Sequence, residues 1–500
     1  MAFSDLPSEA PFASSYAQLP DEFFARVAPT PVATPRLLRL NEGLAAELGF
    51  SPGELERPEG VEILAGNRRL GGADPIAMAY AGHQFGNWSP RLGDGRAIQI
   101  GEAVDREGVA RGIQLKGAGP TPFSRQGDGR AAIGPVLREY VLSEAMFALG
   151  IPTTRALAMV TTGESVHRER PEAGAILTRV AAGYVRVGTF EYFAAGGLDD
   201  AVRTLADYVL ERRYPEALAE ANPYRALLER VIDRQADLIA RWMLVGFIHG
   251  VMNTDNMSIM GETIDYGPCA FLDEYDPGKV YSSIDRQGRY AYGQQPGIGL
   301  WNLTRFAETL LPLLAEEQEA AVEFAQDVLG GYGALFQQRY EEGLRQKLGL
   351  AESGDETRAL ASGLLQAMTD QGADFTLTFR GLSALGVESS AGDEAVRSLF
   401  GEPAALDAWL VDWRACLRAE GAQDAARIAA MKAVNPLFIP RNHRVQEAIE
   451  ACAEHGDLGP LDALLAVTAR PFEEASADGA PDYAAPPEPH EVVRQTFCGT

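Results

Sequence analysis

Two oxygen-bearing side chains stand in a short segment that could bind a metal ion. The segment is HGVMNTDNMSIMGETIDYGP, residues 249–268, and the two side chains are Asn256 and Asp265. Gly261 and Glu262 are typical of a two-residue turn, so we predict a hairpin that places Asn256 and Asp265 on one face, about 7 Å apart at the backbone. Amide and carboxylate oxygens at that separation suit Mg²⁺, which keeps further positions for phosphate oxygens and water.

The alternative for this pair is a surface hairpin whose polar ends are only solvated. Two neighbouring features favour the metal site. An apolar, buried helix is expected to end at Gly250, and the sequence Asp-Tyr-Gly follows at 265–267. We therefore predict that a divalent cation, Mg²⁺ or Mn²⁺, binds here together with nucleotide phosphates.

Asp255 is the carboxylate inside this loop that could act as a general base. In protein kinases the Asn of such a loop follows a catalytic Asp by five residues. The same count back from Asn256 reaches Val251, which cannot accept a proton. Asp255 could replace that base, since it lies beside the predicted metal, although an Asp here could also cap the loop through an Asx turn.

Lys116 is the candidate for binding phosphate in the first half of the chain. The chain has four Lys and forty Arg, and Lys116 stands in the probable strand GIQLKGAG, where a buried charge needs a partner. Glu139 lies on an otherwise apolar face of the predicted helix 135–149 and could form that ion pair. The alternative is a surface Glu favoured by the helix dipole near its N-terminus.

Glycine-rich turns and two arginines extend the possible nucleotide site. Gly93, Gly95 and Arg96 precede the predicted strand AIQIGE, where backbone amides could approach phosphates, although most such turns are ordinary. Arg179 and Arg186 could add positive charge to a triphosphate site. GDGR recurs at 127–130, and its spacing alone gives it no role. No GxxxxGK[ST] phosphate loop occurs, which disfavours the P-loop NTPases.

The predicted elements must bring these side chains together, and their order indicates an α+β fold. Short Gly-punctuated strands and one helix occupy 76–195, and helical periodicity dominates 196–470. A small β-rich lobe before a large helical lobe is the arrangement of a protein kinase. We expect an N-terminal extension over 1–75 and a flexible Pro- and Ala-rich tail over 471–500.

Charge and composition exclude several classes of protein. The formal net charge of −26 argues against general binding to nucleic acid or anionic membranes, whereas residues 91–138 hold eight Arg or Lys against five Asp or Glu, which suits nucleotide phosphates. No long apolar run or secretion signal is present, so we expect a cytoplasmic protein. The four cysteines form no CxxC pair, and reduced thiols are expected.

Six segments together resemble the selenoprotein O family, also called YdiU, over about residues 76–445. They are YAGHQFGNWSPRLGDGRAIQIGE, QLKGAGPTPFSRQGDGRA, LREYVLSEAM, TRVAAGYVRVGTFEYF, HGVMNTDNMSIMGETIDYGPCAFLDEYDP and NPLFIPRNH. The resemblance implies a kinase-like two-lobed fold and a protein adenylyltransferase. Such an enzyme binds ATP in a flipped orientation and moves AMP onto protein Ser, Thr or Tyr hydroxyls.

The resemblance also implies a role for each site residue. Asp255 is implied as the proton acceptor, Asn256 and Asp265 as Mg²⁺ ligands, and Glu139 as the partner of the lysine. The residues implied to contact the nucleotide are Gly93, Gly95, Arg96, Lys116, Asp128, Gly129, Arg179, Arg186 and Asp265.

One feature departs from the family pattern. Some bacterial members pair a Cys near the C-terminus with a Cys after Asp-Tyr-Gly, and Cys498 matches the first, but Tyr281 stands at the second position. Redox regulation by that disulfide is therefore disfavoured, while the Cys498 thiol could still be redox-active. Two other functions stay open: γ-phosphoryl transfer, which Val251 disfavours, and a non-catalytic, ATP-binding pseudokinase. The acceptor proteins, the oligomeric state and the physiological metal stay open too.

Overall fold

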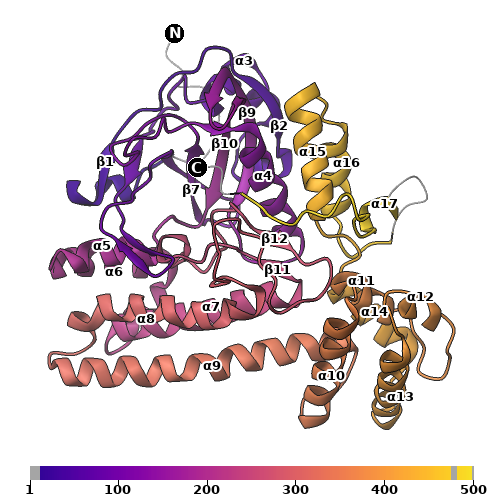
Figure 1. Ribbon diagram of the computed structural model, residues 1–500. Helices are drawn as coiled ribbons and strands as arrows, with labels where there is room; N and C mark the ends of the chain where they lie inside the picture. The colour runs from indigo at the N-terminus through magenta and orange to yellow at the C-terminus, as the bar shows by residue number, and fades with distance from the viewer. Residues whose placement is uncertain (1–11, 475–480, 498–500) are drawn as a thin grey trace.

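The computed structural model describes residues 12–474 and 481–497. An antiparallel sheet of eight strands lies above a set of long helices in Figure 1, with its strands in the order β1-β3-β6-β7-β10-β9-β2 and β8 paired to β10. The described strands are β1 (Phe24–Arg26), β2 (Arg36–Leu40), β3 (Ile76–Met78), β4 (Gly82–Gln84), β5 (Asn87–Ser89), β6 (Ala97–Val104), β7 (Ala110–Lys116), β8 (Ala131–Ala132), β9 (Arg155–His167), β10 (Pro171–Ala181), β11 (Phe247–Ile248) and β12 (Ala270–Phe271).

Helices make up most of the chain after β10. They are α5 (Val187–Ala195), α6 (Asp199–Arg213), α7 (Pro223–Leu244), α8 (Gln295–Leu314), α9 (Gln318–Leu348), α10 (Asp355–Gln371), α11 (Phe375–Leu382), α12 (Asp393–Arg397), α13 (Ala404–Ala419), α14 (Asp424–Val434), α15 (Asn442–His455), α16 (Gly459–Thr468) and α17 (Pro481–Ala484). Earlier in the chain lie α1 (Glu42–Glu47), α2 (Pro52–Leu55), α3 (Pro58–Leu64) and α4 (Ile133–Ala148).

The sheet has an apolar core on each face, because side chains alternate along a strand. On β10, Ile176 packs in the same core as Leu44 of α1 and Leu64 of α3. The next residue, Leu177, packs in the core that contains Tyr140 of α4. The sheet is thus held between the N-terminal helices and α4, which fixes the strands that carry the predicted phosphate-binding residues.

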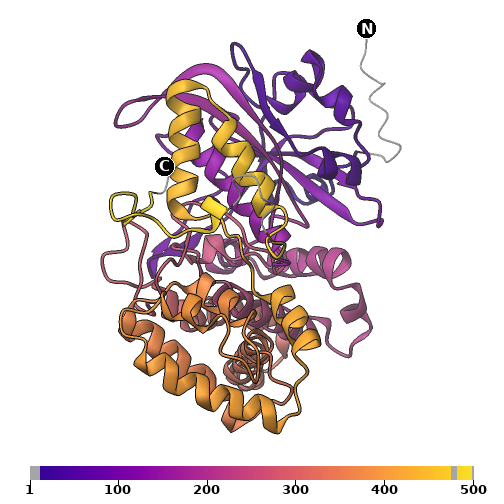
Figure 2. The same ribbon diagram turned by 90° about the vertical axis from the view of Figure 1, so that its right-hand side faces the viewer.

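Helices from the end of the described chain return to this upper part. Both α15 and α16 pack against α4, although they follow it by hundreds of residues. Figures 1 and 2 show them as a yellow pair beside α4 and the sheet. The long helices α7, α8 and α9 pack side by side below, and α10 to α14 project at one end. The last helices therefore clamp the helix that carries Glu139.

The architecture confirms an α+β fold of helices and an antiparallel sheet. The helix predicted over 135–149 is α4, and residues from the expected 1–75 extension add β1 and β2 to the same sheet. The predicted stop at Gly250 is wrong, because α7 ends at Leu244 and is followed by Gly246 in the left-handed region, φ +75°.

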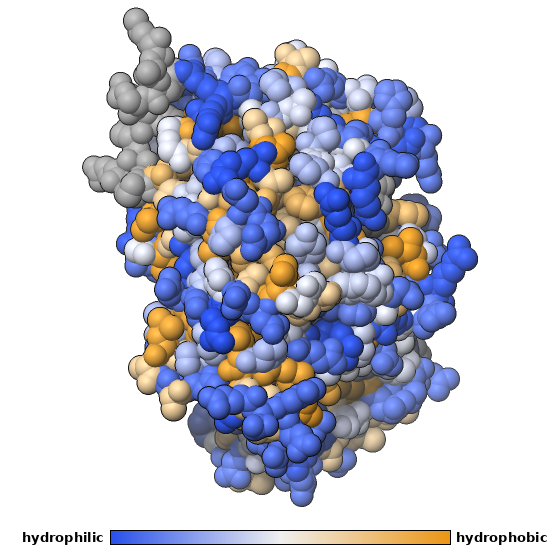
Figure 3. All heavy atoms as spheres, turned by 90° about the vertical axis from the view of Figure 1, so that its left-hand side faces the viewer, coloured by the Kyte–Doolittle hydropathy of each residue, from blue (hydrophilic) through white to orange (hydrophobic). Residues whose placement is uncertain are grey.

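The surface is mainly hydrophilic on the face shown in Figure 3, with apolar residues scattered between charged ones. This agrees with the formal charge of −26. Across residues 12–474 and 481–497, no helix is both long and apolar enough to cross a membrane.

Candidate active site

A cavity of about 630 Å³ gathers the residues that the sequence singles out. Its walls come from the turns around β6 and β7, from β10 and from the segment 251–268. The predicted residues that line it are Gly93, Gly95, Arg96, Lys116, Asp128, Gly129, Arg179, Arg186, Asp255, Asn256 and Asp265. Glu139 lies behind this wall and contacts Lys116. The structure thus brings the predicted set together, and the role of each member stays a prediction.

Three cations surround the carboxylate of Asp265 at the bottom of the cavity. Asp265 Oδ1 lies 2.8 Å from Lys116 Nζ and 2.7 Å from Arg179 Nη1, and its Oδ2 lies 2.7 Å from Arg186 Nη1. Burial alone would raise the pKa of Asp265, but these three cations hold it well below its usual range. Asp265 is therefore ionised. Its backbone takes the left-handed conformation, with φ +63°.

The strands and α4 set the positions of these cations. Lys116 ends β7, and Leu177 of β10 is its cross-strand partner, so Arg179 lies diagonally from Lys116 on the same face. From α4, Glu139 places Oε2 2.5 Å from Lys116 Nζ and Oε1 3.2 Å from Arg179 Nη1. The predicted ion pair is present, and it includes Arg179, whose side chain is only 1% exposed.

A further carboxylate completes the charge balance. Asp94, between Gly93 and Gly95, is buried and lies 3.8 Å from Arg186 Nη2. Burial raises the pKa of Asp94, and its Oδ1 has no hydrogen-bond partner. Lys116 and the buried Arg179 and Arg186 thus face three carboxylates, so a bound phosphate group adds net negative charge that a metal ion could offset.

The predicted hairpin around Gly261 and Glu262 is wrong. Ser258 bridges to Arg186 and Thr263 bridges to Thr153, so the two halves pair with other parts of the fold. Glu262 is buried and accepts a hydrogen bond from the backbone N–H of Ala182, at 2.9 Å. Tertiary partners therefore override the local turn, yet Asn256 and Asp265 still reach the same cavity.

Asp255 is packed between the short β4–β5 hairpin and α5. The residue is 7% exposed, and Gln84 Nε2 of β4 lies 3.4 Å from its Oδ2. A Cβ at Gly82 would stand 2.8 Å from Asp255 Oδ1, so only glycine fits there without a shift. Burial raises the pKa of Asp255 to about 6, which favours proton acceptance near neutral pH.

Asn256 presents an oxygen to the cavity because its amide group is fixed. Its Nδ2 donates to the carbonyl of Val251, at 3.0 Å, which leaves Oδ1 as an acceptor. Val251 itself is buried and packs in the apolar core. Asn256 and Asp265 offer two hard oxygen donors, a set that would fit Mg²⁺ or Mn²⁺ completed by phosphate and water. No cluster of three or more His, Cys, Asp or Glu is found in the described part of the chain.

The two GDGR turns both line the cavity, and each is closely packed against the segment 119–123. Gly93 has φ +68°, and a Cβ there would lie 2.2 Å from Phe123. Gly129 has φ +65°, and a Cβ there would lie 2.1 Å from the carbonyl oxygen of Gly119. Asp128 is engaged by Arg168 of the β9–β10 turn, with contacts of 2.9 and 3.2 Å, and this pairing lowers the pKa of Asp128. Both turns need glycine, and both face the cavity.

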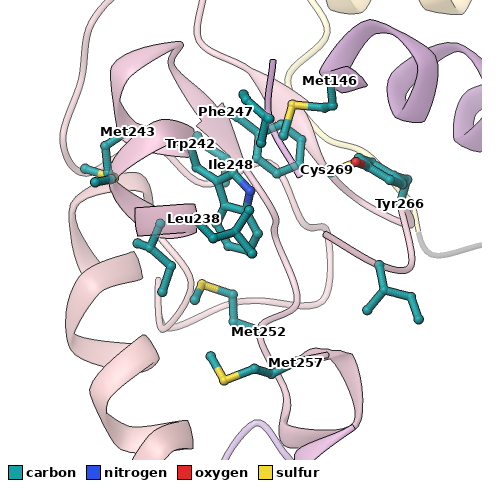
Figure 4. Packing of buried hydrophobic residues seen from close by; sticks show 14 of the residues in the cluster. Met146, Leu238, Trp242, Met243, Phe247, Ile248, Met252, Met257, Tyr266 and Cys269 are labelled. Carbon is teal, nitrogen blue, oxygen red and sulfur yellow. The ribbon is translucent and has the colours of Figure 1, made fainter. Parts of the chain in front are cut away.

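Buried apolar side chains pack around the residues that follow Asp265. Figure 4 shows Met146 of α4 reaching the cluster that holds Phe247, Tyr266 and Cys269. The rings of Phe247 and Tyr266 are 6.0 Å apart between centroids, and Tyr266 Oη pairs with Thr153 Oγ1. Cys269 is buried and its pKa is raised to about 12, so it is an inert thiol.

The segment after Asp265 is tied to the C-terminal tail. Thr496 N donates to Tyr281 O at 2.7 Å, and Thr496 Oγ1 donates to Pro268 O, whose residue lines the cavity. Tyr281 is buried and accepts at Oη from Asn442 Nδ2, at 3.3 Å. Cys498 lies outside the described residues, so its redox role stays a prediction.

Comparison with known proteins decides the family. A family model described as "Protein adenylyltransferase SelO" matches residues 8–469. The chain belongs to this SelO family. A relative from Rhodopseudomonas palustris (strain BisB18) is 62% identical over 490 residues, covering 98% of this chain and 99% of the relative. Relatives from Bradyrhizobium diazoefficiens and Methylorubrum extorquens are 60% and 59% identical over 493 and 498 residues, with 98% and 99% of the two chains covered in each case. Each of the three is named "Protein nucleotidyltransferase YdiU".

Sequence reasoning missed some residues that shape this SelO-family site. Asp94, Arg168 and Gln84 line the cavity, and each contacts a predicted residue. Asp94 stood inside the first GDGR, where a charged residue between two constrained glycines was a usable signal. Gln84 and Arg168 carried no local signal, because their partners are distant in sequence.

Proposed function

We propose that the chain transfers AMP from ATP to Ser, Thr or Tyr hydroxyls of proteins, releases pyrophosphate and requires Mg²⁺ or Mn²⁺. The observation that carries this proposal is the set of three cations around Asp265 at the bottom of the cavity, with the carboxylate of Asp255 in the same cavity. Its membership in a family described as protein adenylyltransferases supports the same reaction.

The difference in burial between the charged groups at the two ends of the cavity supports ATP binding in the flipped orientation. Arg179 is 1% exposed, whereas the Asp128 side chain on the second GDGR turn is 44% exposed. Lys116, Arg179 and Arg186 would bind the β- and γ-phosphates at the bottom, which places the AMP part toward the outside. An acceptor protein would then reach the α-phosphate without entering the bottom of the cavity.

The chemistry follows from these positions. Asp255 takes the proton of the acceptor hydroxyl, whose oxygen forms a bond to the α-phosphorus as the bond to the β-phosphate oxygen breaks. Lys116, Arg179 and Arg186 stabilise the negative charge of the departing pyrophosphate. Asn256 and Asp265 would hold the divalent metal, which neutralises phosphate charge and orients the nucleotide when bound.

The lobe organisation is part of this proposal. We assign the kinase-like small lobe to 76–195 and the helical large lobe to 196–470, with extensions over 1–75 and 471–500. The Lys116–Glu139 pair and the Asn256–Asp265 pair support this assignment, since they match the parts of a kinase site.

Labelled ATP tests the reaction. The protein is incubated with Mg²⁺ or Mn²⁺, a protein mixture and ATP carrying label at the α- or the γ-phosphate. We expect label on protein from the α position only. Label from the γ position only would overturn AMP transfer in favour of phosphoryl transfer, and no label from either would indicate an ATP-binding pseudokinase.

A further inference from the structure

We propose that the acceptor protein carries an apolar side chain next to its hydroxyl residue, and that Ile284 and Phe85 bind this side chain. The inference rests on the proposed AMP transfer and adds which acceptor segments the site selects. Both residues line the cavity that contains Asp255.

Ile284 is unusual among the apolar residues of this cavity. It is 55% exposed, whereas Leu92 and Val251 in the same lining are buried. Single exposed apolar residues are common on protein surfaces. An exposed isoleucine at the mouth of a cavity lined by charged groups is different, because a substrate that enters there removes its surface from water, which favours binding.

The loop that carries Ile284 is fixed beside the reactive groups. At one end Tyr290 Oη donates to Asn253 Oδ1, at 2.6 Å, two residues before Asp255. At the other end Ser283 N donates to Thr496 O, at 3.1 Å, and Thr496 Oγ1 donates to Pro268 O. Ile284 therefore lies on a loop held to both sides of the predicted catalytic and metal segment.

Phe85 stands on the β4–β5 hairpin and is fixed by the same asparagine. Its backbone is left-handed, φ +51°, an unfavourable conformation for a residue other than glycine. Its N–H donates to Asn253 Oδ1 at 2.9 Å, and its ring lies 5.0 Å from that of Tyr290. One oxygen of Asn253 thus holds both the hairpin and the loop at set positions relative to Asp255.

The two apolar side chains are suited to an apolar group of the acceptor and not to the phosphates of the nucleotide. The phosphates require the cations that surround Asp265, and neither Ile284 nor Phe85 can neutralise charge. The acceptor hydroxyl has to approach Asp255, which brings its neighbouring residues toward the hairpin and the loop. An aliphatic or aromatic neighbour would be buried between them.

A peptide library tests this selection. The peptides have a fixed Ser, Thr or Tyr with randomised neighbours and equal net charge, and are incubated with α-labelled ATP and Mg²⁺. For the unmodified protein we expect Leu, Ile, Met or Phe to be enriched next to the modified residue. Ile284→Ser should raise the KM of an apolar-flanked peptide about tenfold, the equivalent of roughly 1.4 kcal/mol, and leave the Kd for ATP unchanged.

A matched control and three outcomes complete the test. Val411 of α13 is 65% exposed and does not line the cavity, so Val411→Ser should keep the enrichment. Enrichment that Ile284→Ser removes and Val411→Ser retains supports the inference. Labelling of peptides without apolar enrichment, or enrichment that survives Ile284→Ser, overturns it and leaves AMP transfer intact. Absence of α-label on every peptide and protein overturns the proposed function and this inference with it.

Discussion

Lys116 and Glu139, 23 residues apart in the chain, meet with 2.5 Å between Nζ and Oε2. The same Nζ lies 2.8 Å from Asp265 Oδ1. The ammonium group is therefore held between a carboxylate of α4 and the predicted metal ligand, and it cannot move toward phosphate without changing both contacts.

Glu139→Gln tests this arrangement. The amide keeps the volume of the side chain but loses the charge that orients Lys116, so the KM for ATP should rise about tenfold, as expected for the loss of one charge-assisted hydrogen bond. Lys116→Met should reduce kcat/KM by about a hundredfold or more, with the fold intact. Transfer of α-label measures both. Unchanged kinetics in Glu139→Gln would show that the pair has no part in ATP use.

Asp265→Asn should change stability as well as activity. It removes a carboxylate from Lys116 and from the buried Arg179 and Arg186, so we expect a loss of about 3 kcal/mol in the free energy of unfolding and no turnover. Metal-free tripolyphosphate should restore stability, because it supplies the missing negative charge. Urea unfolding with and without tripolyphosphate measures this. Asp233→Asn, at a half-exposed pair with Arg339, serves as control and should lose no more than about 1 kcal/mol. If the two variants were equally stable, the charge of Asp265 would not be what stabilises the three cations.

Gly82→Ala should displace the proposed base. The added Cβ would stand 2.8 Å from Asp255 Oδ1, so the loop must shift, and kcat should fall by about a hundredfold, the scale of losing a positioned general base. The Kd for ATP should change much less than kcat, because Lys116 and Arg179 stand on β7 and β10, although Arg186 Nη1 donates to the carbonyl of Asp255 at 2.6 Å. Gly330→Ala, in open space on α9, is the matched control and should retain full activity. A normal kcat in Gly82→Ala would show that a Cβ at residue 82 does not displace Asp255 from its working position.

Lys347→Met should stabilise the fold at neutral pH. Lys347 of α9 is buried with its Nζ 4.3 Å from the ring centroid of Phe379, and burial lowers its pKa from 10.5 to about 7. The unfolded chain therefore binds more protons between pH 7 and pH 10.5, so the wild type gains stability as pH rises through that window. The destabilisation is fully present below about pH 7.

Urea unfolding of the two proteins at pH 7 and pH 9 measures this effect. Lys347→Met should be more stable at pH 7 by up to about 4 kcal/mol, on the order set by the pKa change, and its advantage should shrink at pH 9. A variant that is less stable at pH 7, with the same pH dependence as wild type, would show that Lys347 is held by favourable contacts.

Local chemistry explains which parts of the site could be predicted. A lysine in a buried strand and a glutamate on an apolar helix face each require an opposite charge, so their pairing followed from the sequence. The predicted hairpin around Gly261 is wrong, because Ser258 and Thr263 form isolated bridges with Arg186 and Thr153, far away in the chain. A short sequence segment does not show whether its residues will pair with each other or with distant parts of the chain.

The fold, too, was predictable from the sequence where it depends on local contacts and not where it depends on distant ones. The apolar periodicity of 135–149 predicted α4, whose register depends on contacts within one helix. The return of α15 and α16 onto α4, and the pairing of Thr496 with Tyr281, join elements hundreds of residues apart. Nothing in the periodicity of either partner specifies those contacts.

The bond from Thr496 to Pro268 spans 228 residues. A ribosome adding about 5 to 20 residues per second makes Thr496 roughly 10 to 45 seconds after Pro268. During that interval the segment after Asp265 lacks the hydrogen bonds that Thr496 makes to it. The contact of Thr496 with the cavity wall at Pro268 is therefore among the last to form as the chain is made.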